Sequence, residues 1–139
     1  MMSDIAEHIE GSDKITSVFG YWPSFHDAEI LCFELRRGGV GLAVLTPPVL
    51  TLQVRHWQMT NEVKPDGYFV HEHETISTLR FYKVDDVKLD GFNRQNVIFD
   101  LRIERKEQHF DVALEPCFGI EASFTCARIE VVDVQPTAR

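Results

Sequence analysis

The chain has 139 residues, of which 44% are hydrophobic and 26% charged, and its formal net charge is −8. This length and composition predict one globular domain spanning residues 1–139 and argue against a disordered chain. The acidity argues against nucleic acid and anionic membranes as partners, because both are bound through basic surfaces. A basic protein remains as a partner that the charge would attract, and solubility remains as the plainer reason for the charge.

The cysteines indicate a reducing compartment. Cys32, Cys117 and Cys126 are odd in number, form no C-x-x-C pair and lack the spacing of zinc ligands. No signal peptide and no apolar run approaching ~18 residues is present. We therefore expect a cytoplasmic protein with free thiols and no cofactor.

The first elements expected are one or two short helices within residues 1–20. Ile5 and Ile9 are four residues apart and would share a helical face. Gly20 would close the second helix. These helices are expected to lie across a sheet.

A turn follows, because Pro23 fixes its own φ and pushes Trp22 into an extended conformation. Trp22 and Phe25 carry enough apolar area to close one end of a core.

Strand patterns fill residues 28–134. Apolar alternation or short apolar runs occur at 29–37, 40–45, 49–56, 70–82, 84–89, 97–104, 110–114 and 122–134. Residues 57–69 are expected to form a long connection with a tight turn at Asp66-Gly67. The alternation predicts that Phe99 faces the core and that Pro116 ends its strand.

Two strands change phase. In 70–82 the phase shifts near Ser77-Thr78, which predicts a β-bulge, and in 122–134 it shifts near Ala127. The fold class expected is mainly β: an antiparallel β-sandwich or a strongly curved sheet of six to seven strands, with the short helices at the N-terminus. The oligomeric state is open, since an exposed edge strand could pair two copies.

His26 and Asp27 are the first candidates for chemistry. A His-Asp pair can serve acid–base catalysis if a nucleophile comes from elsewhere. The structural alternative, which we favour, is that Asp27 accepts backbone N–H bonds and His26 donates to a carbonyl.

A second candidate is the run His71-Glu72-His73-Glu74. On a strand His71 and His73 share one side, but a metal site normally needs three or four ligands. We favour a solvated strand start over a metal site. The glutamates could join an acidic flank, whose other members would be Glu62, Asp66, Asp85, Asp86 and Asp90.

Several fragments together resemble one family. They are WPSFHDAE at 22–29, MTNEV at 59–63 with GY at 67–68, GFN at 91–93 with QNVI at 95–98, and EPCFG at 115–119. In their order and spacing, from about residue 15 to 132, they resemble the immunity protein 50 family of bacterial polymorphic toxin systems.

The resemblance implies a non-catalytic cytoplasmic protein that binds and neutralises a cognate toxin, with a basic toxin such as a nuclease domain suiting the acidic chain. It implies a fold-maintaining role for the motif residues, which are Trp22, Pro23, Phe25, His26, Asp27, Gly91, Asn93, Asn96 and Gly119. The toxin-contacting surface usually differs between members of such families, so the motif residues are poor candidates for the interface. The candidate partner-binding residues are Tyr68, Phe69, Glu72, Glu74, Asp85 and Asp86.

Two alternatives stay open. One is a small metal-dependent hydrolase that uses His26 and Asp27, with His71 and His73 as further candidates. The other is a β-sandwich module that binds a small ligand in a deep aromatic pocket.

Overall fold

Eight antiparallel strands and two short helices make up the described part of the chain. The computed structural model describes residues 5–39, 46–63, 65–67 and 69–137, and for 59–63 and 69–72 it describes the backbone alone. The elements, in chain order, are η1 (Ile5–His8), α1 (Asp13–Phe19), β1 (Glu29–Arg36), β2 (Val49–Val63), β3 (Phe69–Tyr82), β4 (Asp85–Asp90), β5 (Val97–Arg105), β6 (Phe110–Phe118), β7 (Glu121–Cys126) and β8 (Arg128–Pro136). The strands form one sheet in the order β4-β7-β6-β5-β1-β2-β3-β8.

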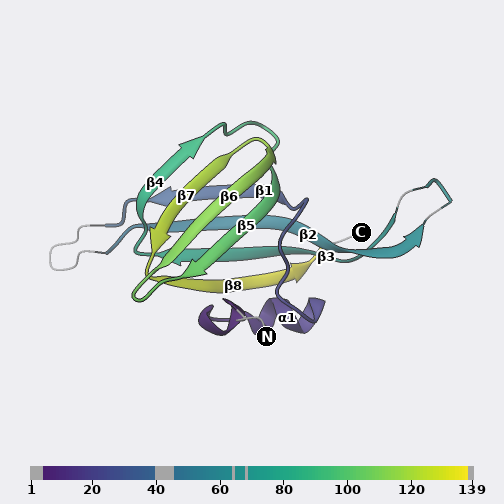
Figure 1. Ribbon diagram of the computed structural model, residues 1–139, viewed down its shortest axis with the longest axis horizontal. Coiled ribbons are helices and arrows are strands. Elements are labelled where there is room, and N and C mark those ends of the chain that lie inside the picture. The colour runs from purple at the N-terminus through teal and green to yellow at the C-terminus, as the bar shows by residue number, and fades with distance from the viewer. Residues whose placement is uncertain (1–4, 40–45, 64, 68, 138–139) are drawn as a thin grey trace.

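This single sheet folds over on itself, so that β4, β7, β6 and β5 cross in front of β1, β2, β3 and β8 (Figure 1). We call the two halves the front and back layers. Their inward faces share one core, in which the rings of Phe81 on β3 and Phe124 on β7 lie 5.1 Å apart. The strongly curved sheet expected from the sequence is therefore present, with eight strands in place of six to seven and without a second, separate sheet.

The layers join at two corners. At the first, β1 pairs with β5 only at Glu29↔Val97, and the two strands then diverge. At the second, the chain leaves β7 at Cys126, bends at Ala127 and enters β8 in the other layer. The amide of Ala127 donates to the Tyr82 carbonyl at 2.9 Å, which fixes the bend.

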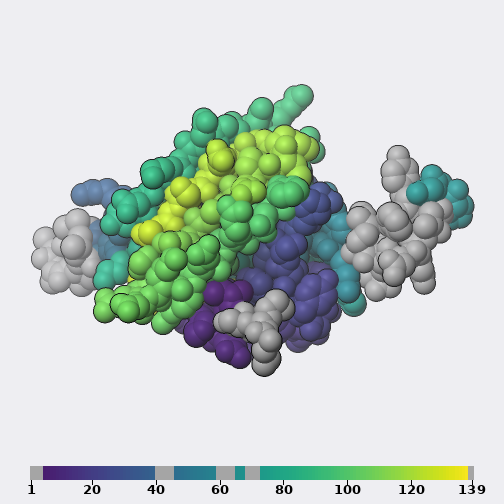
Figure 2. Space-filling model, in the orientation of Figure 1, coloured from purple at the N-terminus to yellow at the C-terminus, as the bar shows by residue number. Residues whose placement is uncertain are grey.

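The N-terminal helices lie beside β8 and contact β5 and β3 (Figure 1). Ile9, Ile15 and Phe19 are buried in the core. Glu10 pairs with β8 through its backbone: its amide donates to Ile129, and its carbonyl accepts from Val131. Figure 2 shows this segment, in purple and blue, packed against the green strands of the front layer.

Helix α1 ends as the sequence predicts. Gly20 adopts a left-handed φ of 83°, and its N–H donates to the Thr16 carbonyl at 2.7 Å. Because Gly lacks a Cβ, it enters this region without steric cost.

The expected connection at 57–69 is wrong. β2 continues to Val63 and β3 begins at Phe69, so the two strands extend as a ribbon beyond the rest of the sheet (Figure 1). Residues 65–67 form the turn that Asp66-Gly67 predicts. The turn-forming residues Asn61, Pro65, Asp66 and Gly67 hid these strand ends, although Trp57, Met59 and Val63 alternate with polar residues.

The expected single strand at 122–134 is also wrong, because it is two strands in different layers. β7 lies between β4 and β6, whereas β8 is the edge strand beside β3. The phase change at Ala127 therefore marks a corner between two strands. Treating these two strands as one is part of the reason why the sequence predicted fewer than eight.

The predicted bulge at Ser77-Thr78 lies on the neighbouring strand. Pairing of β2 with β3 is continuous there, whereas β8 holds an extra residue, Val132, between the partners of Thr78 and Leu79. Thr75 and Ser77 face inward and are buried, so β3 keeps its phase. The polar side chains at these two inward positions interrupt the apolar alternation, which led to the prediction of a bulge on β3.

Two predictions for β5 and β6 are wrong. Phe99 is 52% exposed, because an irregularity between Ile98 and Asp100 turns it outward and buries Ile98 in its place. Pro116 does not end its strand; β6 runs on to Phe118, and Pro116 pairs with Ile98. The apolar run at 40–45 lies outside the described residues.

Candidate functional site

The segment at 22–29 crosses the first corner of the sheet. Phe25 and Asp27 have positive φ values of 64° and 69°, which turn the chain sharply between α1 and β1. The amide of Asp27 donates to the Ile98 carbonyl at 2.8 Å, and the Ile98 amide donates to Ala28 at 2.9 Å. The backbone of this segment therefore joins β1 to β5.

The aromatic side chains of the segment close this end of the core. Phe25 is buried, and Trp22 packs on its edge with ring centroids 5.6 Å apart. Pro23 is half-buried just before them.

The His26 and Asp27 side chains lie on the surface. Nδ1 of His26 donates to the Phe99 carbonyl oxygen at 2.8 Å, and Nε2 lies 3.5 Å from Asp27 Oδ1. The two side chains are 52% and 46% exposed, and the His26 ring packs on Phe99. A backbone carbonyl thus orients His26, and the expected carbonyl partner is present.

A cavity of about 270 Å³ lies beside this pair, lined by Tyr21, Pro23, Ser24, Phe25, His26, Asp27, His56, Trp57 and Gln58. Within the described ranges, no three His, Cys, Asp or Glu side chains converge in an arrangement that could hold a metal ion. The cavity can therefore take a small polar group, but its described ionisable side chains do not form a metal centre.

His56 is a buried polar residue that the sequence analysis did not single out. Its Nε2 lies 2.7 Å from Ser77 Oγ and 3.2 Å from Thr75 Oγ1, and its ring stacks on Phe19 at 4.9 Å. Nδ1 has no hydrogen-bond partner among the described residues. Burial lowers the pKa of His56 to about 4, so the ring is neutral near neutral pH. The alternation of β2 could have identified His56 as buried, because His56 continues the inward-facing row of Leu50, Leu52 and Val54.

The motif residues at 91–119 meet in one turn cluster. Oδ1 of the buried Asn96 accepts hydrogen bonds from the amides of Asn93 at 3.0 Å and Ile120 at 2.9 Å, and its Nδ2 donates to Asn93 at 2.7 Å. A Cβ on Gly119 would lie 2.5 Å from Asn96 Oδ1, and one on Gly91 would lie 2.8 Å from the Gly119 carbonyl oxygen. This cluster joins the end of β4 to the starts of β5 and β7.

The structure describes few of the side chains among the candidate partner-binding and metal-ligating residues at 68–74. Tyr68 lies outside the described residues, and for Phe69, His71 and Glu72 the backbone alone is described. Glu74 is only 27% exposed; it accepts from Thr137 Oγ1 at 2.7 Å and lies 3.8 Å from Arg55. His73 packs edge-on against Phe19.

Asp85 and Asp86 are exposed at the start of β4, where Asp85 Oδ1 accepts the Asp86 amide at 2.9 Å. Glu74 lies far from both aspartates along β3, since residues 74–82 of this strand extend over about 26 Å. The structure therefore does not bring Glu74 together with Asp85 and Asp86 in one acidic flank.

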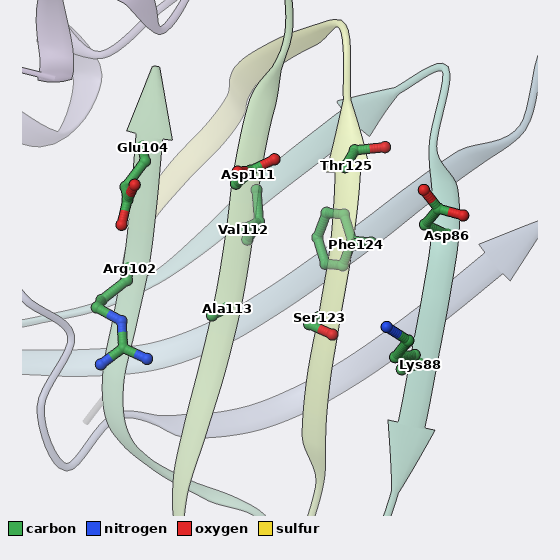
Figure 3. Close-up of a pocket in the computed structure, with 10 residues that line it drawn as sticks. All are labelled: Asp86, Lys88, Arg102, Glu104, Asp111, Val112, Ala113, Ser123, Phe124 and Thr125. Atoms are coloured by element: carbon green, nitrogen blue, oxygen red, sulfur yellow. The ribbon is translucent and has the colours of Figure 1, made fainter. Parts of the chain in front are cut away.

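A shallow trough marks the outer face of the front layer (Figure 3). Its floor consists of the small side chains Ala113 on β6 and Ser123 on β7, and its walls are the long side chains of Arg102 on β5 and Lys88 on β4. Its hollow measures about 490 Å³, and a second hollow of about 280 Å³ continues it over the same four residues. None of these four was a candidate from the sequence.

The protein so defined is a small, mainly β protein, with one folded sheet that presents a charged trough. A model of the family described as immunity protein 50 matches residues 11–137, and the chain belongs to this family. No curated protein and no solved structure matches the chain. None of its described helices is long and apolar enough to cross a membrane.

Replacing Gly119 by Ala tests the turn cluster. The new Cβ would meet Asn96 and the Gln95 carbonyl at a positive φ of 92°, so we expect Gly119→Ala to lower the free energy of unfolding by about 3 kcal/mol. Gly20→Ala is the matched control, because its φ is also positive and nothing lies within 4 Å of its Cβ position; it should cost about 1 kcal/mol. Urea unfolding measures both, and equal losses would contradict the packing described for the cluster.

The buried His56 predicts a pH dependence of stability. Its pKa in the folded protein is about 4, below the ordinary histidine value of 6.5, so between these pH values the unfolded chain binds the proton more readily. Stability is therefore fully present above pH 6.5 and falls as the pH drops toward 4, by on the order of 3 kcal/mol.

His56→Gln should remove this part of the slope, because glutamine does not titrate. His8→Gln, at an exposed position, is the control. Urea unfolding at a series of pH values gives the slope; identical slopes for His56→Gln and the unaltered chain would show that His56 does not titrate in this way.

Proposed function

We propose that this protein binds and neutralises a cognate toxin of a bacterial polymorphic toxin system, in the cytoplasm and without catalysis. The match of residues 11–137 to the immunity protein 50 family carries the proposal. Inhibition of this kind needs a surface that covers the toxin and requires no reacting group of its own.

The folded sheet supports this proposal, because little of it must become ordered on binding. Seven of its neighbouring strand pairs are hydrogen-bonded, and both layers contribute to one buried core. A surface that is already ordered loses less side-chain and loop freedom when a partner docks, so more of the contact energy appears as affinity.

The charge supports a basic toxin as the partner. A net charge of −8 would accelerate the approach of a basic protein, such as a nuclease domain, at low ionic strength. Fast association suits an immunity protein, which must capture its toxin before the toxin acts.

The geometry of the exposed His26-Asp27 pair supports a structural role at the corner of the sheet rather than acid–base chemistry. His26 donates to a main-chain oxygen of β5, and Asp27 supplies a backbone turn with positive φ. Both features hold the first corner of the sheet.

The experiment is co-expression with the product of the neighbouring open reading frame, which the proposal predicts to be the toxin. Cells that make the toxin alone should stop growing, and cells that also make this protein should grow. Purified protein should bind the toxin with one-to-one stoichiometry in isothermal titration calorimetry. Growth arrest despite co-expression, with no heat of binding, would refute the proposed function.

The double variant His26→Gln with Asp27→Asn separates binding from catalysis. Asn tolerates the positive φ at position 27, so the fold should be kept. A binding protein should protect as well as the unaltered chain does, because neither group reacts. Loss of protection by a folded variant that still binds the toxin would instead assign chemistry to this pair.

A further inference from the structure

The outer face of the front layer carries its side chains in three rows that cross the four strands. The middle row is Lys88, Ser123, Ala113 and Arg102, whose members are register partners across β4, β7, β6 and β5. The rows on either side are acidic. One holds Asp86, Thr125, Asp111 and Glu104, and the other holds Asp90, Glu121, Glu115 and Asp100.

The acidic rows place like charges on neighbouring strands. Glu104 is the register partner of Asp111, Asp90 of Glu121, and Asp100 of Glu115. Like charges directly opposite each other destabilise a sheet. Lys106 offsets one row by pairing with Glu104 at 3.2 Å and Asp111 at 3.9 Å.

In the row of Asp90, Glu121, Glu115 and Asp100, some acidic side chains are left without an ion pair among the described residues. Arg102 pairs with Glu115, but Asp90 and Glu121 have no ion pair within the described part of the chain. A basic partner would relieve this repulsion, so the face is complementary to positive charge at both ends.

The middle row offers the opposite charge in the centre of the trough. Arg102 and Lys88 stand on the two outer strands with Ala113 and Ser123 between them (Figure 3). Among the described residues, Lys88 has no ion-pair partner. The small floor leaves room above it for a partner's side chain, and Lys88 is available to an acidic one.

The dimensions suit an α-helix. Three strand spacings separate β4 from β5, or about 14 Å, and a helix with its side chains is about 10–12 Å wide. Neighbouring rows are two residues apart, or about 6.7 Å, close to the roughly 6 Å rise between helix positions i and i+4. A partner strand fits less well, because the backbone groups of β6 and β7 already pair with strands on both sides.

We propose that this trough, made by Lys88, Arg102, Ala113, Ser123 and the two acidic rows, binds an α-helix of the toxin. The helix would lie along β6 and β7, with Lys or Arg at positions i and i+8 over the acidic rows and Asp or Glu at i+4 over the middle row. This inference rests on the proposed function and adds to it the site and the charge pattern of the partner.

The first test fills the trough. Ala113→Arg puts a long side chain on the floor, and Thr78→Arg puts the same side chain on the outward face of β3 in the other layer. Calorimetry with the toxin encoded beside this chain should show affinity reduced about tenfold or more for Ala113→Arg and little changed for Thr78→Arg. Circular dichroism and urea unfolding establish that both variants are folded.

The second test reverses charge without filling the trough. Glu121→Lys and Asp133→Lys change the net charge equally, but Asp133 is exposed on β8. Stopped-flow association should slow more for Glu121→Lys, and its dissociation should be faster, because the change removes a local contact as well as long-range attraction.

The outcomes separate the two proposals. If the unaltered chain binds and protects while Ala113→Arg and Glu121→Lys bind as it does, the trough is not the interface and the proposed function stands. If the unaltered chain neither binds nor protects, the proposed function fails and this inference fails with it. If both trough variants lose affinity and both controls keep it, the inference holds.

Discussion

The structure depends on the corner where β1 meets β5. Only one register pair joins these strands, yet the front layer continues into the back layer of the sheet through this pair. The main-chain bonds of Asp27, Ala28 and Ile30 to β5 and to Asn96 add to that pair. Because a buried amide or carbonyl without a partner costs about 1–3 kcal/mol, separating β1 from β5 is unfavourable, and this network holds the front layer to the back layer.

The same corner explains why the motif residues are close to one another in space. Asn96 accepts from Ile120 at the start of β7, and Gly119 has no Cβ that would collide with Asn96. Phe25 and the neutral His56 fill the core beneath the segment, with ring centroids 4.9 Å apart. The residues that most resemble a catalytic cluster in the sequence thus hold the two layers together, which leaves the outward faces of the strands for a partner.

The sequence predicted the strand-rich class, the capped helix and the turn at 65–67 because each rests on local rules: alternation, a Gly with positive φ, and Asp-Gly chemistry. It missed the β2–β3 ribbon, since the turn-forming residues Asn61, Pro65, Asp66 and Gly67 indicated a loop there. It also joined β7 to β8, since one bent strand and two strands around a corner give the same phase change.

The trough could not be predicted from the sequence, because its rows join residues from four strands whose order in the sheet differs from their order in the chain. Lys88 and Arg102 are ordinary exposed charges until β7 and β6 are placed between them. The family resemblance pointed to an inhibitor and to motif residues inside the fold. The arrangement of charge on the front layer came only from the register of its strands.

The central claim is that this protein acts by covering a toxin with the outward face of its front layer, and the structure of the complex tests it most directly. The account predicts a toxin helix lying along β6 and β7, with Ala113 and Ser123 buried beneath it and basic side chains over both acidic rows. A complex in which the toxin contacts only the back layer or the β2–β3 ribbon, and the trough stays open to solvent, would contradict it.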